Sequence, residues 1–293
     1  MAIIAWAARG LKRDWKQIGE ESIDWDLDPA LIIVSLIITW AMYLMLIYAW
    51  RAVLQAWGDH LAFRSAVRIW FVSSLGKYVP GKLWALAAMA VLAERAGVSG
   101  GAATASSIVM QLLSITTGIA IAIALLGSTV VGDSTSLGFV GVVALMTVAL
   151  AGTSMVASPR IMNWLGRVIG RPGGVRHVGV NALALAAIPS AIAWLGYGTA
   201  LYLLVLGTLP AVTLSWSLAT GAFAASYVAG YLAVIAPGGL GVREAALILI
   251  LGPTIGHGNV LAIAFASRLT LTLNELGVAL PLLFFGRSSR DIT

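Results

Sequence analysis

Long apolar runs dominate the chain, and their lengths predict which segments cross a membrane. A helix needs roughly 20 mostly apolar residues to span a bilayer. Five segments satisfy that length: 30–50, 100–126, 137–157, 180–206 and 259–285. They predict an all-α polytopic membrane protein with about five full transmembrane helices.

Two further apolar stretches are interrupted by proline and glycine. Residues 61–95 break at VPG (79–81), and residues 216–251 break at APGG (236–239). Proline removes a backbone donor and glycine loosens the chain, so each stretch is typical of two helices joined by a turn. A continuous helix of that length would reach roughly 50 Å, well beyond a hydrocarbon core of roughly 30 Å. We therefore predict two re-entrant helical hairpins, with Pro80, Gly81 and Pro237 as hinges.

Composition and charge support the membrane interpretation. The chain is 60% hydrophobic and 10% charged, whereas soluble domains carry about 25% charged residues. The net charge of +6 is explained by membrane topology rather than by nucleic acid, because basic residues gather in cytoplasmic loops. With two hairpins, an outer N-terminus and an inner C-terminus, the inner loops collect 12 of the 18 basic residues. These are Arg51, Arg64, Arg68, Lys77, Lys82, Arg95, Arg160, Arg167, Arg171, Arg176, Arg287 and Arg290.

The second half of the chain repeats the element order of the first. Pro80 and Pro237 are 157 residues apart, and the same offset lays Gln111 over Arg268. We expect residues 1–28 to form an interfacial amphipathic segment, and 29–286 to form a single membrane domain. That domain comprises repeat 1 (about 30–126), a joining helix (137–157) and repeat 2 (about 180–285). Because three membrane crossings separate equivalent points of the two repeats, repeat 2 is predicted to have the opposite orientation in the membrane. Such inverted repeats are found in secondary transporters.

The second break carries the clearest candidate chemistry. Gly238 and Gly239 lie beside a predicted helix start, where backbone N–H groups and the helix dipole favour an anion. Arg243 and Glu244 follow inside an apolar run, where ionisable groups normally face protein or a water-filled cavity. In one interpretation Arg243 binds a phosphate and Glu244 balances charge or carries a proton. In the other the two residues form a structural pair that locks the hairpin.

Other polar residues extend this candidate site. Lys77 and Lys82 flank the first break, as headgroup ligands or as snorkelling topology anchors. Gln111 follows the first break on a polar helix face. Arg268 and Glu275 share a face seven residues apart, so they are expected to bind substrate and to balance charge or couple protons, respectively.

Catalytic and cofactor sites are not expected. The chain has no cysteine, and its three histidines (His60, His177 and His257) show no metal-ligand spacing. We expect no metal, no cofactor and no catalytic residue, and hence not an enzyme.

Two motifs carry a resemblance to a known family. SLGKYVPGKLW (74–84) and APGGLGVREAAL (236–247) resemble the flippase-like integral membrane family, also called the lysylphosphatidylglycerol synthase transmembrane region. The matching positions are Lys77, Pro80, Gly81, Lys82, Pro237, Gly238, Gly239, Gly241, Arg243 and Glu244.

The resemblance implies a function in lipid movement. In the larger synthases this region moves an aminoacylated phospholipid between leaflets, and a separate soluble domain makes that lipid. Only RSSRDIT follows Gly286, so we expect a stand-alone member without the synthase activity. Many members have an extra leading transmembrane helix that this sequence does not show.

Together these features predict a lipid flippase of the bacterial inner membrane, acting on a phosphate-bearing lipid or lipid-linked precursor. Lys77, Lys82, Arg243 and Arg268 would hold the phosphate. Protein partners would be a second copy of the chain or an envelope-biosynthesis enzyme, and nucleic acid is not expected. Three alternatives remain open: a non-catalytic membrane partner of a glycosyltransferase or lipid synthase, a membrane enzyme acting on a lipid phosphate, and a transporter of a soluble solute.

Overall fold

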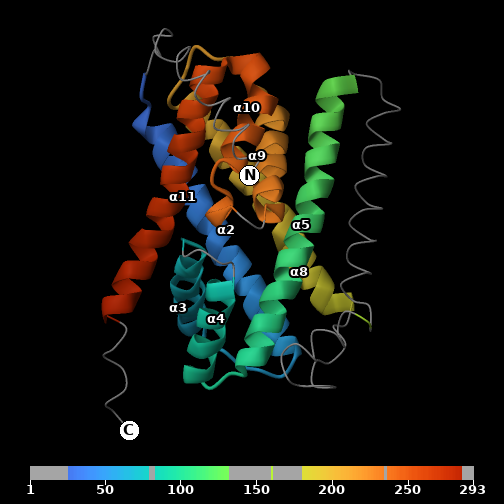
Figure 1. Ribbon diagram of the computed structural model, residues 1–293, viewed down its shortest axis with the longest axis vertical. Coiled ribbons are helices and arrows are strands. Elements are labelled where there is room, and N and C mark those ends of the chain that lie inside the picture. The colour runs from blue at the N-terminus through green and yellow to red at the C-terminus, as the bar shows by residue number, and fades with distance from the viewer. Residues whose placement is uncertain (1–25, 79–82, 132–159, 161–179, 234–235, 286–293) are drawn as a thin grey trace. The chain divides into compact units, whose positions relative to one another are not determined.

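The computed structural model describes residues 26–78, 83–131, 160, 180–233 and 236–285 (Figure 1). Within these ranges the chain forms eight α-helices and two short 3-10 turns, with no strand, which confirms the all-α class. The elements are α2 (Pro29–Ala56), α3 (Phe63–Ser74), η1 (Leu75–Tyr78), α4 (Leu83–Arg95), α5 (Gly100–Val131), α8 (Val180–Leu206), α9 (Trp216–Leu232), η2 (Pro237–Gly239), α10 (Val242–Ile255) and α11 (His257–Phe285).

Among the described residues, four helices are long and apolar enough to cross a membrane: α2, α5, α8 and α11. They coincide with four of the five predicted crossings. The fifth, the joining helix 137–157, lies outside the described residues, as do most of the N-terminal segment and the first break with Pro80, Gly81 and Lys82.

Helix α11 has one exposed apolar face and one buried face. Large apolar side chains are exposed at Phe265, Leu269 and Leu273, a spacing of four residues that places them on one face. Ser267, Leu271 and Glu275 repeat at the same spacing but are buried. The polar groups of α11 at these buried positions therefore face protein.

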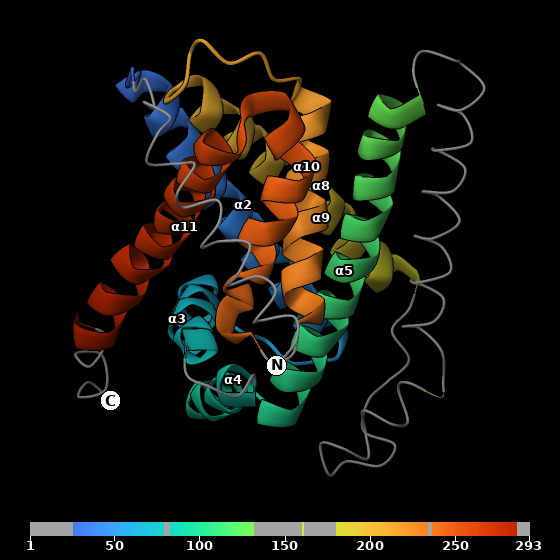
Figure 2. The same cartoon turned by 45° about the horizontal axis from the view of Figure 1, so that its top comes forward.

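The two broken stretches each form a pair of helices packed side by side, α3 with α4 and α9 with α10 (Figure 2). In the turn of the first pair, a Cβ at Gly76 would lie 2.5 Å from the backbone nitrogen of Ala85. Only glycine permits that approach of η1 to α4. That each stretch forms two helices is confirmed, whereas residues 79–82 and 234–235 at the breaks lie outside the described residues. That each pair enters and leaves the membrane on the same side stays a prediction.

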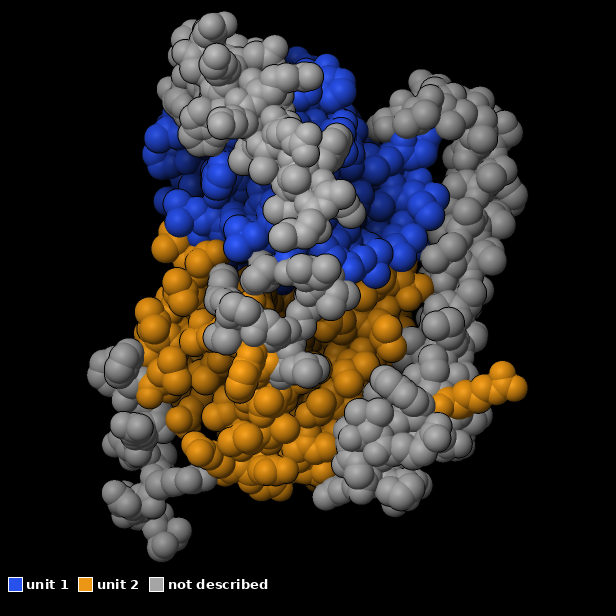
Figure 3. Space-filling model, viewed as in Figure 1, with its two compact units in different colours: residues 1–40, 118–145, 194–271 blue, residues 41–117, 146–193, 272–293 orange. Residues whose placement is uncertain are grey.

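The chain divides into two compact units (Figure 3). Unit 1 comprises residues 1–40, 118–145 and 194–271, and it contains the α9–α10 pair. Unit 2 comprises residues 41–117, 146–193 and 272–293, and it contains the α3–α4 pair.

The two units have corresponding contents. Each holds one helix pair, the second half of the long helix before that pair and the first half of the long helix after it. Each also holds the complementary halves of the other two long helices. This correspondence supports a repeat of crossing, hairpin and crossing, and the inversion of that repeat stays a prediction.

Gly198 generates a prediction about packing between α8 and α9. A Cβ at Gly198 would lie 2.6 Å from the Cα of Thr220, so Gly198→Ala forces the backbones apart. We expect a loss of about 1–3 kcal/mol of stability, measured as a lower midpoint of thermal unfolding in detergent.

Gly277→Ala is the matched control in α11, because nothing lies within 4 Å of its added Cβ. It should leave the midpoint unchanged or raise it, since alanine stabilises a helix interior by about 1 kcal/mol over glycine. Equal behaviour of the two variants would contradict the close α8–α9 contact.

Candidate functional site

Arg243, in the first turn of α10, is a buried cation supported by aromatic rings. It is 9% exposed. Its guanidinium carbon lies 3.9 Å from the ring centroid of Tyr227 and 6.0 Å from that of Phe223, both on α9. The cation is attracted to the negative face of the tyrosine ring. Across the part of the chain that the structure describes, Arg243 makes no hydrogen bond or ion pair, and its Nε is buried without a partner.

The glycines around the second break make room for this side chain. A Cβ at Gly230 would lie 2.6 Å from the Cγ of Arg243, and one at Gly239 would lie 3.0 Å from the Cα of Gly230. Gly238, Gly239 and Gly241 adopt φ values of 57°, 70° and 79°, which L side chains avoid. Because these positions carry no side chain, the turn packs closely against α9 and leaves room for the aliphatic part of the Arg243 side chain.

Two of the glycine amides in this turn are already used. The N–H of Gly239 donates to the carbonyl of Ala236 (3.0 Å), and the N–H of Gly241 donates to Oε2 of Glu244 (2.8 Å). An anion here would therefore be held mainly by Arg243 rather than by these two amides.

Glu244 pairs with Arg268 of α11, not with its neighbour Arg243. Its Oε1 accepts from Nη1 of Arg268, while Nη2 of Arg268 donates to the carbonyl of Gly238 (3.2 Å). Glu244 thus caps the start of α10 and, through Arg268, fixes the turn against α11. The predicted Arg243–Glu244 pair is therefore not formed, and Glu244 instead links the hairpin to Arg268 of α11.

Unit 2 holds a second buried network. Glu275 of α11 is 2% exposed, and its Oε1 accepts from Nζ of Lys77 in η1. The same oxygen accepts from the hydroxyl of Tyr43 on α2 at 2.7 Å. The side chain of Lys77 stays one-third exposed. Lys77 is therefore tied to α11 through a carboxylate that also anchors α2.

The structure groups the predicted residues into these two networks. Gly238, Gly239, Arg243, Glu244 and Arg268 belong to unit 1, whereas Lys77 and Glu275 belong to unit 2. Pro237 opens η2. Gln111 is exposed on α5 in unit 2.

Sequence reasoning missed the aromatic residues Tyr43 and Tyr227. The available signal for Tyr43 was a phenol in the middle of an apolar run. Tyr227 had a different signal: it lies between Phe223 and Tyr231 at four-residue steps, and the three rings form a continuous row on α9 with centroids 5.3 and 5.2 Å apart.

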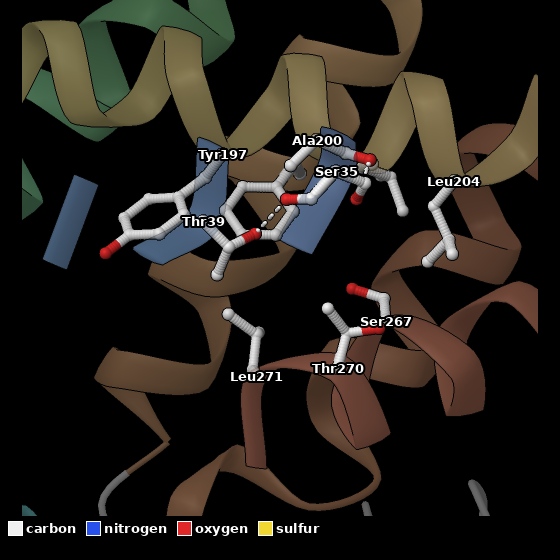
Figure 4. Close-up of a pocket in the computed structure, with 10 residues that line it drawn as sticks. Ser35, Thr39, Tyr197, Ala200, Leu204, Ser267, Thr270 and Leu271 are labelled. Carbon is white, nitrogen blue, oxygen red and sulfur yellow. Dashed lines mark hydrogen bonds between the residues drawn. The ribbon is translucent and has the colours of Figure 1, made fainter. Parts of the chain in front are cut away.

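A further feature that the sequence did not reveal is a small cavity in unit 1, lined by hydroxyl groups from α2 and α11 (Figure 4).

The Glu244–Arg268 pair generates a prediction about stability. Glu244→Gln leaves a mostly buried guanidinium without its carboxylate, so we expect destabilisation of about 3–5 kcal/mol. The double variant Glu244→Gln and Arg268→Gln should recover part of that loss, because no unbalanced charge remains. Unfolding midpoints of both single variants and the double variant measure the coupling. Strictly additive losses would contradict the pairing.

Comparison with known proteins places the chain in a family. A search of curated proteins finds no match. The family model described as the lysylphosphatidylglycerol synthase TM region matches residues 1–273. This agrees with the resemblance carried by the two break motifs and with the four described helices that are long and apolar enough to cross a membrane. It indicates a multi-pass membrane protein related to lipid synthesis or flipping. The chain belongs to the lysylphosphatidylglycerol synthase TM region family.

Proposed function

We propose that the protein is a lipid transporter that moves a phosphate-bearing lipid or lipid-linked precursor between the leaflets of a bacterial inner membrane. It acts without a cofactor and without chemical conversion of the lipid. The family match supports a role with lipids, and the charges buried in the two networks support transport as that role.

Arg243 is the observation that carries the proposal. A buried guanidinium without a hydrogen-bonding partner is costly, because burial removes water from a charge. Tyr227 offsets part of that cost through its ring face. A phosphate would offset much more, since charge-assisted hydrogen bonds to guanidinium are among the strongest in proteins. The site is therefore matched to an anionic group that arrives and leaves.

The other charged residues have supporting roles in this proposal. Arg268 is engaged by Glu244 and by the Gly238 carbonyl, so it holds the turn that presents Arg243 and adds to the positive potential there. Lys77 is engaged by Glu275, and a phosphate at Lys77 would compete with that carboxylate. Glu244 and Glu275 balance charge while the headgroup is absent, and either could carry a coupled proton.

The lipid tails need no binding site of their own. The exposed apolar faces of the long helices leave acyl or prenyl chains in the bilayer while the headgroup moves along protein. Energy would come from an ion gradient, or the lipid would move downhill.

Replacing Arg243 tests the proposal directly. We expect Arg243→Gln to lower the rate of translocation of fluorescent phosphatidylglycerol at least about tenfold, because one charge-assisted contact contributes about 1.5–3 kcal/mol. The rate is measured in reconstituted vesicles by chemical quenching of the fluorophore in the outer leaflet.

Arg64→Gln is the matched control, since Arg64 is exposed on α3 and its loss changes the net charge equally. Its rate should equal that of the wild type. A folded Arg243→Gln protein that translocates at the wild-type rate would refute the role of Arg243.

A further inference from the structure

The cavity in unit 1 lies among α2, α8, α9 and α11. Figure 4 shows Ser35 and Thr39 of α2 on one side, with Ser267 and Thr270 of α11 on the opposite side. The remaining lining is apolar or aromatic and includes no carboxylate. The free space is about that of a single water molecule.

Three of the hydroxyl groups have already committed their protons. Ser35 donates to the carbonyl of Ala200 at 2.7 Å. Thr39 donates to the carbonyl of Ser35 at 2.9 Å, and Thr270 donates to the carbonyl of Ala266 at 2.9 Å. A hydroxyl has one proton to donate and two lone pairs to accept with. These three oxygens can therefore only accept from whatever occupies the cavity.

Ser267 adds a fourth oxygen. It is 6% exposed, and within the described ranges its hydroxyl makes no hydrogen bond. In Figure 4 its oxygen points into the space between α2 and α11. The cavity thus offers four oxygens, of which one still has a free proton.

A single water would make three hydrogen bonds here, because it could donate to two of the three acceptor-only oxygens and accept from Ser267. The third acceptor-only oxygen would then have no partner in the cavity. A cation has no such limit, because it attracts every oxygen lone pair around it. Hard cations prefer oxygen ligands, and divalent sites recruit carboxylates, which this lining lacks.

We propose that this cavity binds a dehydrated monovalent metal cation, Na⁺, through the hydroxyl oxygens of Ser35, Thr39, Ser267 and Thr270. The small volume favours Na⁺ over the larger K⁺. The site lies within unit 1 and uses only residues of α2 and α11 as ligands.

The cation site is adjacent to the proposed headgroup site. The ring of Phe223 lines the cavity and lies 6.0 Å from the guanidinium carbon of Arg243. The positive charge of Arg243 opposes a second cation until an anion neutralises it, so a phosphate on Arg243 and Na⁺ in the cavity strengthen each other's binding. This coupling rests on the proposed function, in which Na⁺ is then the coupling ion. Binding of Na⁺ alone does not depend on the proposed function.

Equilibrium binding of radioactive ²²Na⁺ to the purified full-length protein, in detergent micelles containing phosphatidylglycerol, tests the site. We expect saturable binding that unlabelled Na⁺ displaces and that K⁺ or choline at equal ionic strength does not. Thr39→Val, which keeps the shape and removes the hydroxyl, should weaken Na⁺ binding about tenfold or more. Ser267→Ala should weaken it as well and serves as a second variant if Thr39→Val does not fold.

Thr208→Val is the matched control. Thr208 is also buried, and its hydroxyl donates to the carbonyl of Leu204 at 2.7 Å, but it does not line the cavity. Its Na⁺ affinity should equal that of the wild type.

Two results would overturn the cation site: no saturable Na⁺ binding, which would mean that the cavity holds water only, or wild-type affinity in both cavity variants. A parallel measurement of lipid translocation distinguishes failure of the cation site from failure of the proposed function. Arg243-dependent translocation without Na⁺ binding refutes the cation site alone. Na⁺ binding that depends on Thr39, without any translocation, supports the site and refutes transport.

Discussion

The structure depends on how a mostly apolar membrane protein accommodates charged side chains in its interior. Each ionisable group buried among apolar helices must be paired, supported by aromatic rings or placed where a ligand can neutralise it. Glu244 and Arg268 take the first solution, as do Glu275 and Lys77. Arg243 takes the second, resting on Tyr227. The difference between paired and unpaired cations distinguishes structural links from the proposed binding group.

Helix α11 has a central place in this arrangement. Arg268 joins it to the α9–α10 pair in unit 1, and Glu275 joins it to the turn of the α3–α4 pair in unit 2. Its buried face also carries Ser267, while Phe265, Leu269 and Leu273 remain exposed on another face. One amphipathic helix therefore supplies both ion-pair links and half of the hydroxyl cavity. In a transporter, a small displacement of α11 would act on all of these contacts.

Local patterns were enough to identify the elements but not the partners within the site. Apolar run length located α2, α5, α8 and α11, and the breaks located both helix pairs, because membrane-crossing length and proline geometry are local constraints. The burial of Arg243 followed from its position in an apolar run. The partner of Glu244 did not follow, since consecutive residues on a helix do not face each other and the partner lies 24 residues away. The Tyr43–Glu275 contact joins residues 232 positions apart in the sequence, so no local pattern predicts it. The cavity hydroxyls have no distinguishing sequence pattern, because they come together only where α2 packs near α11.

The central claim is that Arg243 holds the phosphate of a membrane lipid, and mass spectrometry of lipids that remain bound after gentle purification tests it most directly. The account predicts that one class of phosphate-bearing lipid is enriched over the bulk membrane in the wild-type protein. This enrichment should be lost in Arg243→Gln and retained in Arg64→Gln. The same lipid profile in all three proteins, equal to that of the bulk membrane, would contradict the claim.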